Sequence, residues 1–193
     1  MTAPASRRAA DNPFSAERID ALTLRPRGWT WDGLLARLEE LDHRAAVVGP
    51  QGSGKTTLLI ELERRVALAT PRIRIDARDP RPVADAFRRA PPDAVAGRVV
   101  LVDGSERLGW FSWWRLRLGW RRAAGLVVTR HAPGRLPTLV EMRTDPALLR
   151  ELVAELTPGE VDRMGIDLDG LFRRHRGDVR SCLRALYDLY ADR

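Results

Sequence analysis

The chain has 193 residues, of which 44% are hydrophobic and 31% are charged, and its formal net charge is +7. This is enough apolar material for one folded domain with a small appendage, and it excludes a wholly disordered or collagen-like chain. The basic residues are 32 arginines and a single lysine, Lys55. Because the bias towards arginine runs through the whole chain, the net charge says little about partners, and the position of the one lysine says more.

Cysteine content and apolar runs indicate the compartment. Cys182 is the only cysteine, so an internal disulfide cannot form, which fits a reducing environment. Residues 1–14 lack the apolar run that a secretory signal needs. No stretch approaches the roughly 20 apolar residues of a membrane span. We therefore expect a cytoplasmic protein.

Periodicity gives the expected elements in chain order. Residues 1–28 show no sustained period, and we expect a flexible arm there, disordered or draped on the core. Thr30 can cap a helix, because leucines follow it at helical spacing. Apolar strands then alternate with amphipathic helices. The expected strands cover 44–48, 71–76, 98–103, 125–129 and 139–142, and the expected helices cover 56–68, 83–90 and 110–122.

After residue 144 we expect helices alone. Asp145 can cap a helix to residue 156 with Pro146 at its first position, and a last helix begins near Gly177. This order favours an α/β core over 29–144 with a mainly parallel sheet, followed by a small helical lid over 145–193.

Residues 49–56 read GPQGSGKT, and they lie between an apolar strand and an amphipathic helix. Glycines let the backbone wrap a phosphate chain with its N–H groups inward, and the helix that follows presents its positive end to the same anion. Lys55 would neutralise the β- and γ-phosphates, where the broad fork of an arginine does not fit. The expected nucleotide-binding residues are Gly49, Gln51, Gly52, Ser53, Gly54, Lys55, Thr56 and Thr57.

This segment resembles the Walker A motif of the P-loop NTPases. The resemblance implies a three-layer α/β/α fold that binds a nucleoside triphosphate, taken as ATP, together with Mg²⁺. Asp103 ends the apolar run RVVLVD and is similar to the Walker B aspartate of that family. Thr56 and Asp103 are therefore the expected metal ligands. The alternative for Asp103 is an ordinary buried strand that ends in a solvated carboxylate.

The residues after Asp103 depart from the commonest Walker B pattern, in which a glutamate follows the aspartate directly. The sequence Gly104-Ser105-Glu106 is similar to the NACHT branch of the STAND ATPases. Glu106 then becomes the candidate that orients or deprotonates the attacking water. Its displacement favours a slow or switch-like ATPase.

Two further residues match this group by position. Thr129 ends the strand GLVVT, where AAA+ and STAND proteins carry a polar residue called sensor 1. Arg180 lies in Gly177-Asp178-Val179-Arg180, which resembles the sensor 2 region of AAA+ proteins. With Lys55 and Glu106, these two complete the expected catalytic set. The alternatives are a plain loop role for Thr129 and a surface arginine on an N-capped helix for Arg180.

Residues 107–135 combine tryptophan with arginine. Four of the six tryptophans lie between residues 110 and 120, and no acidic residue occurs over 107–140. This pattern favours a nucleic acid or another anionic partner. As a helix, the segment has aromatic residues on more than one side, which argues against a clean membrane anchor. The alternative is a helix that packs on the sheet with its arginines directed outwards.

Taken together, the motifs resemble additional-strand P-loop ATPases related to AAA+ and NACHT-like STAND proteins. This resemblance implies ATP binding and slow, Mg²⁺-dependent hydrolysis that drives a molecular switch. Two alternatives stay open. The first is a small-molecule kinase of the nucleotide type, because GPQGSGKTT and the sequence VDG before residue 105 suit one. The second is a non-hydrolysing ATP-binding switch for a protein partner.

Overall fold

The computed structural model describes residues 12–22, 24–76, 79, 81–158 and 165–191. The chain forms two compact units. The sheet unit comprises residues 24–49 and 54–142, and the helical unit comprises the described residues within 1–23, 50–53 and 143–193.

In the described part of the chain, five strands form one sheet in which every pairing is parallel. Its order is β2-β3-β4-β1-β5. The strands are β1 (Arg44–Val48), β2 (Ile73–Arg74), β3 (Val99–Asp103), β4 (Gly125–Arg130) and β5 (Thr138–Glu141). The predicted α/β class with a mainly parallel sheet is confirmed. Since all the strands run the same way, their carboxyl ends lie at one edge of the sheet.

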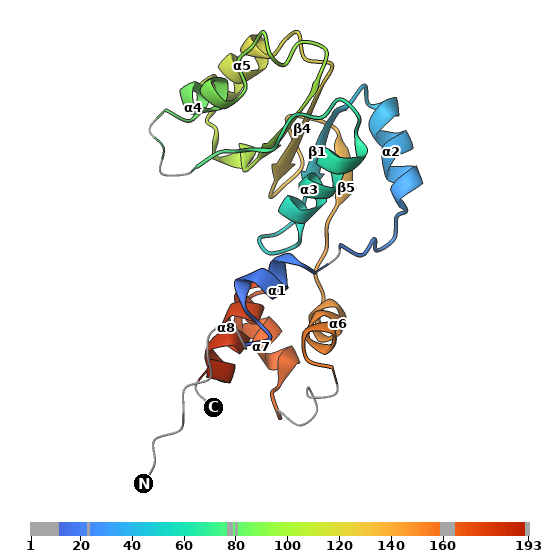
Figure 1. Cartoon of the computed structure of the whole chain (residues 1–193), viewed down its shortest axis with the longest axis vertical. Coiled ribbons are helices and arrows are strands. Elements are labelled where there is room, and N and C mark those ends of the chain that lie inside the picture. Colours follow the sequence, from blue (N-terminus) through green and yellow to red (C-terminus); the bar gives the residue numbers. More distant parts are fainter. Residues whose placement is uncertain (1–11, 23, 77–78, 80, 159–164, 192–193) are drawn as a thin grey trace. The chain divides into compact units, whose positions relative to one another are not determined.

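Near-continuous apolar strands explain why helices cover both faces of this sheet. Alternate residues of β3 enter different cores: Val100 and Val102 pack with α4 (Pro82–Arg89) and α5 (Trp110–Gly119). Val99 and Leu101 pack with α2 (Trp31–Glu40) and α3 (Lys55–Arg65). Figure 1 shows α4 and α5 on one side of the strands and α2 on the other. The sheet unit is therefore a three-layer α/β/α arrangement.

The two helix starts that were predicted from N-capping side chains, at Thr30 and Asp145, are confirmed. Thr30 Oγ1 accepts a hydrogen bond from Gly33 N and caps α2. Asp145 caps α6 (Pro146–Leu156) by accepting from Leu148 N. The limits of some elements differ from the prediction. The strand expected over 71–76 is reduced to β2 at the edge of the sheet, because Pro71 has no N–H to donate and the N–H of Arg72 donates to Glu63.

The helical unit has a core of its own. It contains α1 (Ala16–Asp20), α6, α7 (Leu168–Arg174) and α8 (Val179–Ala191). Phe14 is buried in this core, with its ring edge-on to Tyr190 at a centroid distance of 6.2 Å. Of the arm expected over 1–28, residues 12–22 thus pack in the helical unit, and residues 1–11 lie outside the described part. Among the described residues, no helix is long and apolar enough to cross a membrane.

Candidate functional site

The glycine-rich loop joins β1 to α3. Gly52 and Gly54 have φ angles of 74° and 84°, in the left-handed region that favours glycine. Gly54 is also the N-cap of α3. Because glycine has no side chain to cap a helix, no side chain caps the start of α3, and the positive end of this helix attracts an anion.

Lys55 and Ser53 place two polar side chains in this loop with little access to solvent. Lys55 is 9% exposed, and its Nζ donates to the carbonyl oxygen of Gly49 at 2.7 Å. Ser53 is 4% exposed, and its Oγ has no hydrogen-bond partner among the described residues. An unpaired buried hydroxyl costs free energy, which a ligand oxygen would offset. Ser53, in the helical unit, therefore suits a ligand that accepts a hydrogen bond, and Lys55, in the sheet unit, offers a buried positive charge.

Thr56 and Asp103 meet although 47 residues separate them. Thr56 Oγ1 donates to Asp103 Oδ2 at 2.9 Å, and the Asp103 side chain is 13% exposed. Asp103 ends β3 at the same edge of the sheet from which the loop after β1 departs. A hydroxyl and a carboxylate are hard oxygen ligands of the kind that Mg²⁺ prefers. The two expected metal ligands are thus in direct contact.

Thr129 links this aspartate to the next turn. Its hydroxyl is buried, donates to Asp103 Oδ1 at 2.7 Å and accepts from Gly104 N at 2.7 Å. Ser105 Oγ donates to the Thr129 carbonyl oxygen at 2.9 Å. These bonds make Thr129 a residue that positions the Asp103 carboxylate.

Arg72 is a partner of Asp103 that the sequence analysis missed. Its Nη1 lies 3.2 Å from Asp103 Oδ2, and its backbone N–H donates to Glu63 Oε2. The alternation in residues 71–76 could have revealed it, because Ile73 and Ile75 face the core that contains α5 and the arginines alternate with them. A metal ion at Asp103 would have to compete with this guanidinium.

Glu106 lies in the short 3₁₀ turn η2 (Ser105–Arg107) directly after β3. His131 Nε2 lies 3.0 Å from Glu106 Oε1, whereas Glu106 Oε2 is buried with no hydrogen-bond partner among the described residues. One carboxylate oxygen is therefore oriented and the other is available to accept a proton.

Two arginines after Thr129 add positive charge near the end of β4. Buried N–H groups of Arg130 and Arg135 have no hydrogen-bond partner within the described chain, although Arg135 Nη2 donates to the Leu108 carbonyl oxygen. Burial lowers the pKa of Arg135, and the charge of Arg130 lowers it further. Two cations in proximity favour a bound anion.

Arg180, the expected sensor 2 residue, belongs to the helical unit. It follows the first residue of α8, and its Nη2 lies 3.4 Å from Asp20 Oδ1. Both side chains are more than two-thirds exposed, so the pair contributes little to stability. A role for Arg180 at a nucleotide stays a prediction.

No family model matches the chain, and no curated protein matches it either.

The Thr129 hydroxyl both donates and accepts a hydrogen bond, so we predict that its removal destabilises the fold. Thr129→Val keeps the shape of the side chain but leaves Gly104 N–H without its acceptor and Asp103 Oδ1 without the hydrogen bond from Thr129. We expect a loss of about 1–3 kcal/mol in the free energy of unfolding, measured by urea denaturation. The control is Thr138→Val in β5, which should change stability by less than about 0.5 kcal/mol. Equal effects of the two substitutions would contradict this role.

Proposed function

We propose that the chain binds ATP with Mg²⁺ and acts as a slow ATPase that serves as a molecular switch. The hydrogen bond between Thr56 Oγ1 and Asp103 Oδ2 carries this proposal. It joins the residue after the lysine of the loop to the aspartate at the end of a buried strand, the two residues that the resemblance to P-loop NTPases pairs at the metal.

The strand order also supports the additional-strand type. β4 lies between β1, which enters the loop, and β3, which ends in Asp103. Thr129, near the end of this inserted strand, can therefore reach the Asp103 carboxylate. A sheet that paired β1 directly with β3 would leave no strand to carry Thr129 between them.

The residues present fit a nucleotide with its metal ion. Lys55 and the positive end of α3 would hold the phosphates, and Thr56 and Asp103 would hold Mg²⁺. Among the described residues, no group of three or more His, Cys, Asp or Glu side chains could hold a metal ion. Proteins usually bind Mg²⁺ with one or two carboxylates and the phosphates of the nucleotide, and the contact between Thr56 and Asp103 offers one carboxylate beside a hydroxyl.

The proposed chemistry divides between charge neutralisation and water positioning. Bound Mg²⁺ would supply positive charge to the phosphate oxygens during transfer. Glu106 Oε2 would accept the proton of the attacking water, while His131 keeps Oε1 oriented. Glu106 lies in the turn after β3, three residues after Asp103 and not directly after it, and it is already paired with His131. For these reasons we expect slow turnover.

The lysine provides the first test. Lys55→Ala should weaken MgATP binding about 10- to 100-fold in isothermal titration calorimetry, because a charge-assisted hydrogen bond contributes ~1.5–3 kcal/mol. The matched control is Arg64→Ala, which removes an exposed cation from the same helix. Binding by Lys55→Ala that equals the wild type would contradict the proposal.

Glu106 tests hydrolysis separately from binding. Glu106→Gln should leave MgATP affinity within a factor of about two and lower phosphate release about 100-fold, the usual contribution of a general base. Phosphate release in a single turnover is the measurement, with Glu61→Gln as the control on α3. Unchanged release would remove Glu106 from this role. Tight binding with no release by the wild type would favour the non-hydrolysing switch.

A further inference from the structure

Helix α5 is apolar on two faces, and only one of them is covered. Trp113 and Leu116 are buried against the sheet, and Trp120 is buried just after the helix. On another face, four large side chains stand exposed to solvent: Trp110 at 75%, Phe111 at 62%, Trp114 at 50% and Leu118 at 51%. A helix that is apolar all round is normally buried all round. The open face of α5 is thus suited to a partner outside the described chain.

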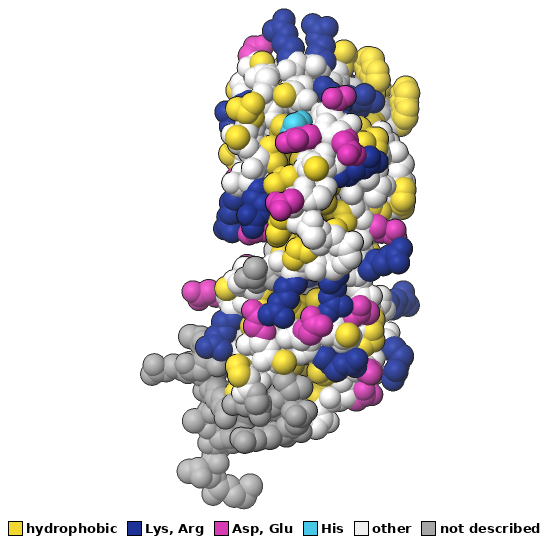
Figure 2. Space-filling model, turned by 90° about the vertical axis from the view of Figure 1, so that its right-hand side faces the viewer, with side chains coloured by type: hydrophobic (Ala, Val, Ile, Leu, Met, Phe, Trp, Pro, Cys, Tyr) yellow, Lys and Arg dark blue, Asp and Glu magenta, His cyan; other side chains and the backbone are white. Residues whose placement is uncertain are grey.

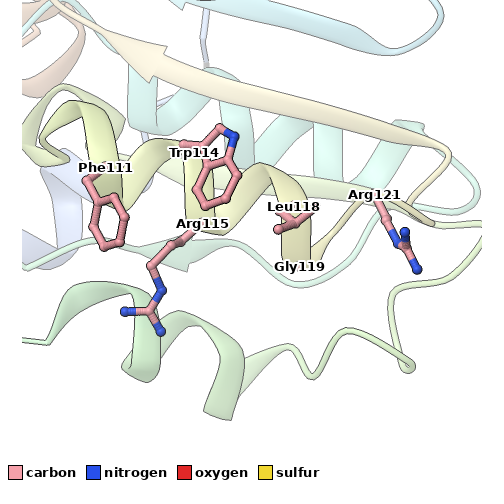
Figure 3. Close-up of a pocket in the computed structure, with 6 residues that line it drawn as sticks. All are labelled: Phe111, Trp114, Arg115, Leu118, Gly119 and Arg121. Atoms are coloured by element: carbon pink, nitrogen blue, oxygen red, sulfur yellow. The ribbon is translucent and has the colours of Figure 1, made fainter.

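The four exposed side chains form one stripe, which we call the α5 stripe. Trp110, Trp114 and Leu118 follow each other at intervals of four residues, so they lie in a row on the helix. Phe111 stands beside the row, and its ring stacks on that of Trp114 at a centroid distance of 6.2 Å. Figure 3 shows Phe111, Trp114 and Leu118 one after another along the helix, next to a shallow open hollow.

Arginines border the α5 stripe. At 100° per residue, Arg117 falls on one side of the row and Arg115 on the other, and Arg121 follows beyond the helix. Figure 3 shows the Arg115 and Arg121 guanidinium groups at the margin of the hollow. On the face that Figure 2 shows, acidic side chains lie among the basic ones, whereas the sequence from 107 to 140 contains no acidic residue. The stripe therefore combines an apolar centre with arginines at its border, while Arg122, further along the chain, pairs with Asp93 at 3.7 Å.

We propose that the α5 stripe binds peripherally to an anionic lipid surface. Tryptophan, phenylalanine and leucine side chains on one face of a helix enter the boundary between headgroups and acyl chains, while arginines reach the phosphates. Considered from sequence alone, aromatic residues on several sides of this helix argue against a membrane anchor. The structure removes that objection, since the tryptophans on the other side, Trp113 and Trp120, are buried.

Single-stranded nucleic acid is the main competitor for this surface, and it fits less well. Stacking sites for successive bases need separate open ring faces. Here Phe111 and Trp114 stack on each other, and Leu118 has no ring to offer. The lipid proposal is independent of the nucleotide proposal, because none of its residues belongs to the loop or to the Asp103 network.

The test is flotation of the full chain with vesicles of phosphatidylglycerol and phosphatidylcholine, compared with phosphatidylcholine alone. We expect binding to the anionic vesicles only, weakening as salt rises. Trp110→Ser combined with Leu118→Ser should lower vesicle affinity about tenfold or more. The control is Leu189→Ser, at a leucine that is 45% exposed on α8, which should leave affinity unchanged.

A second variant tests the charged border without changing the apolar side chains. Arg117→Gln combined with Arg121→Gln should lower affinity for anionic vesicles about tenfold, against no change for Arg37→Gln on α2. Circular dichroism would check that each variant is folded. Absence of vesicle binding, equal binding to phosphatidylcholine alone, or binding to oligonucleotides in place of vesicles would each overturn the proposal.

Discussion

The Asp103 carboxylate is the point on which the candidate site depends. It accepts hydrogen bonds from Thr56 at the start of α3 and from Thr129 near the end of β4, and it pairs with Arg72 at the start of β2. A carboxylate that is only 13% exposed needs such partners to offset the cost of leaving water. These contacts hold the start of α3, the end of β4 and the residue before β2 at the end of β3.

The order of the strands allows these side chains to reach Asp103. A parallel sheet brings the carboxyl ends of its strands to one edge, and the loops that follow them share that edge. Because β4 lies between β1 and β3, its Thr129 hydroxyl can bridge Asp103 and the Gly104 N–H group. Ser105 extends these bonds into the turn after β3, and the same turn carries the Glu106–His131 pair. Our proposal of ATP binding and slow hydrolysis follows from this arrangement of polar groups.

Short sequence patterns predicted those elements whose formation depends on residues that are close together in the chain. Apolar runs marked the central strands, the caps at Thr30 and Asp145 marked helix starts, and the glycine-rich loop marked the candidate site. Contacts between distant segments were harder to predict. The pairing of Arg72 with Asp103 depends on β2 lying beside β3, and the exposure of Trp110 and Trp114 depends on which face of α5 meets the sheet. Neither follows from spacing along the chain alone.

The central claim is that the loop over 49–56 recognises a phosphate chain. The most direct measurement is the affinity of the full chain for ATP, ADP and AMP, each with and without Mg²⁺, by isothermal titration calorimetry. The account predicts that ATP and ADP bind, that Mg²⁺ strengthens ATP binding, and that AMP, which lacks the β-phosphate, binds at least about tenfold more weakly. Equal affinity for all three nucleotides, or binding of none, would contradict it.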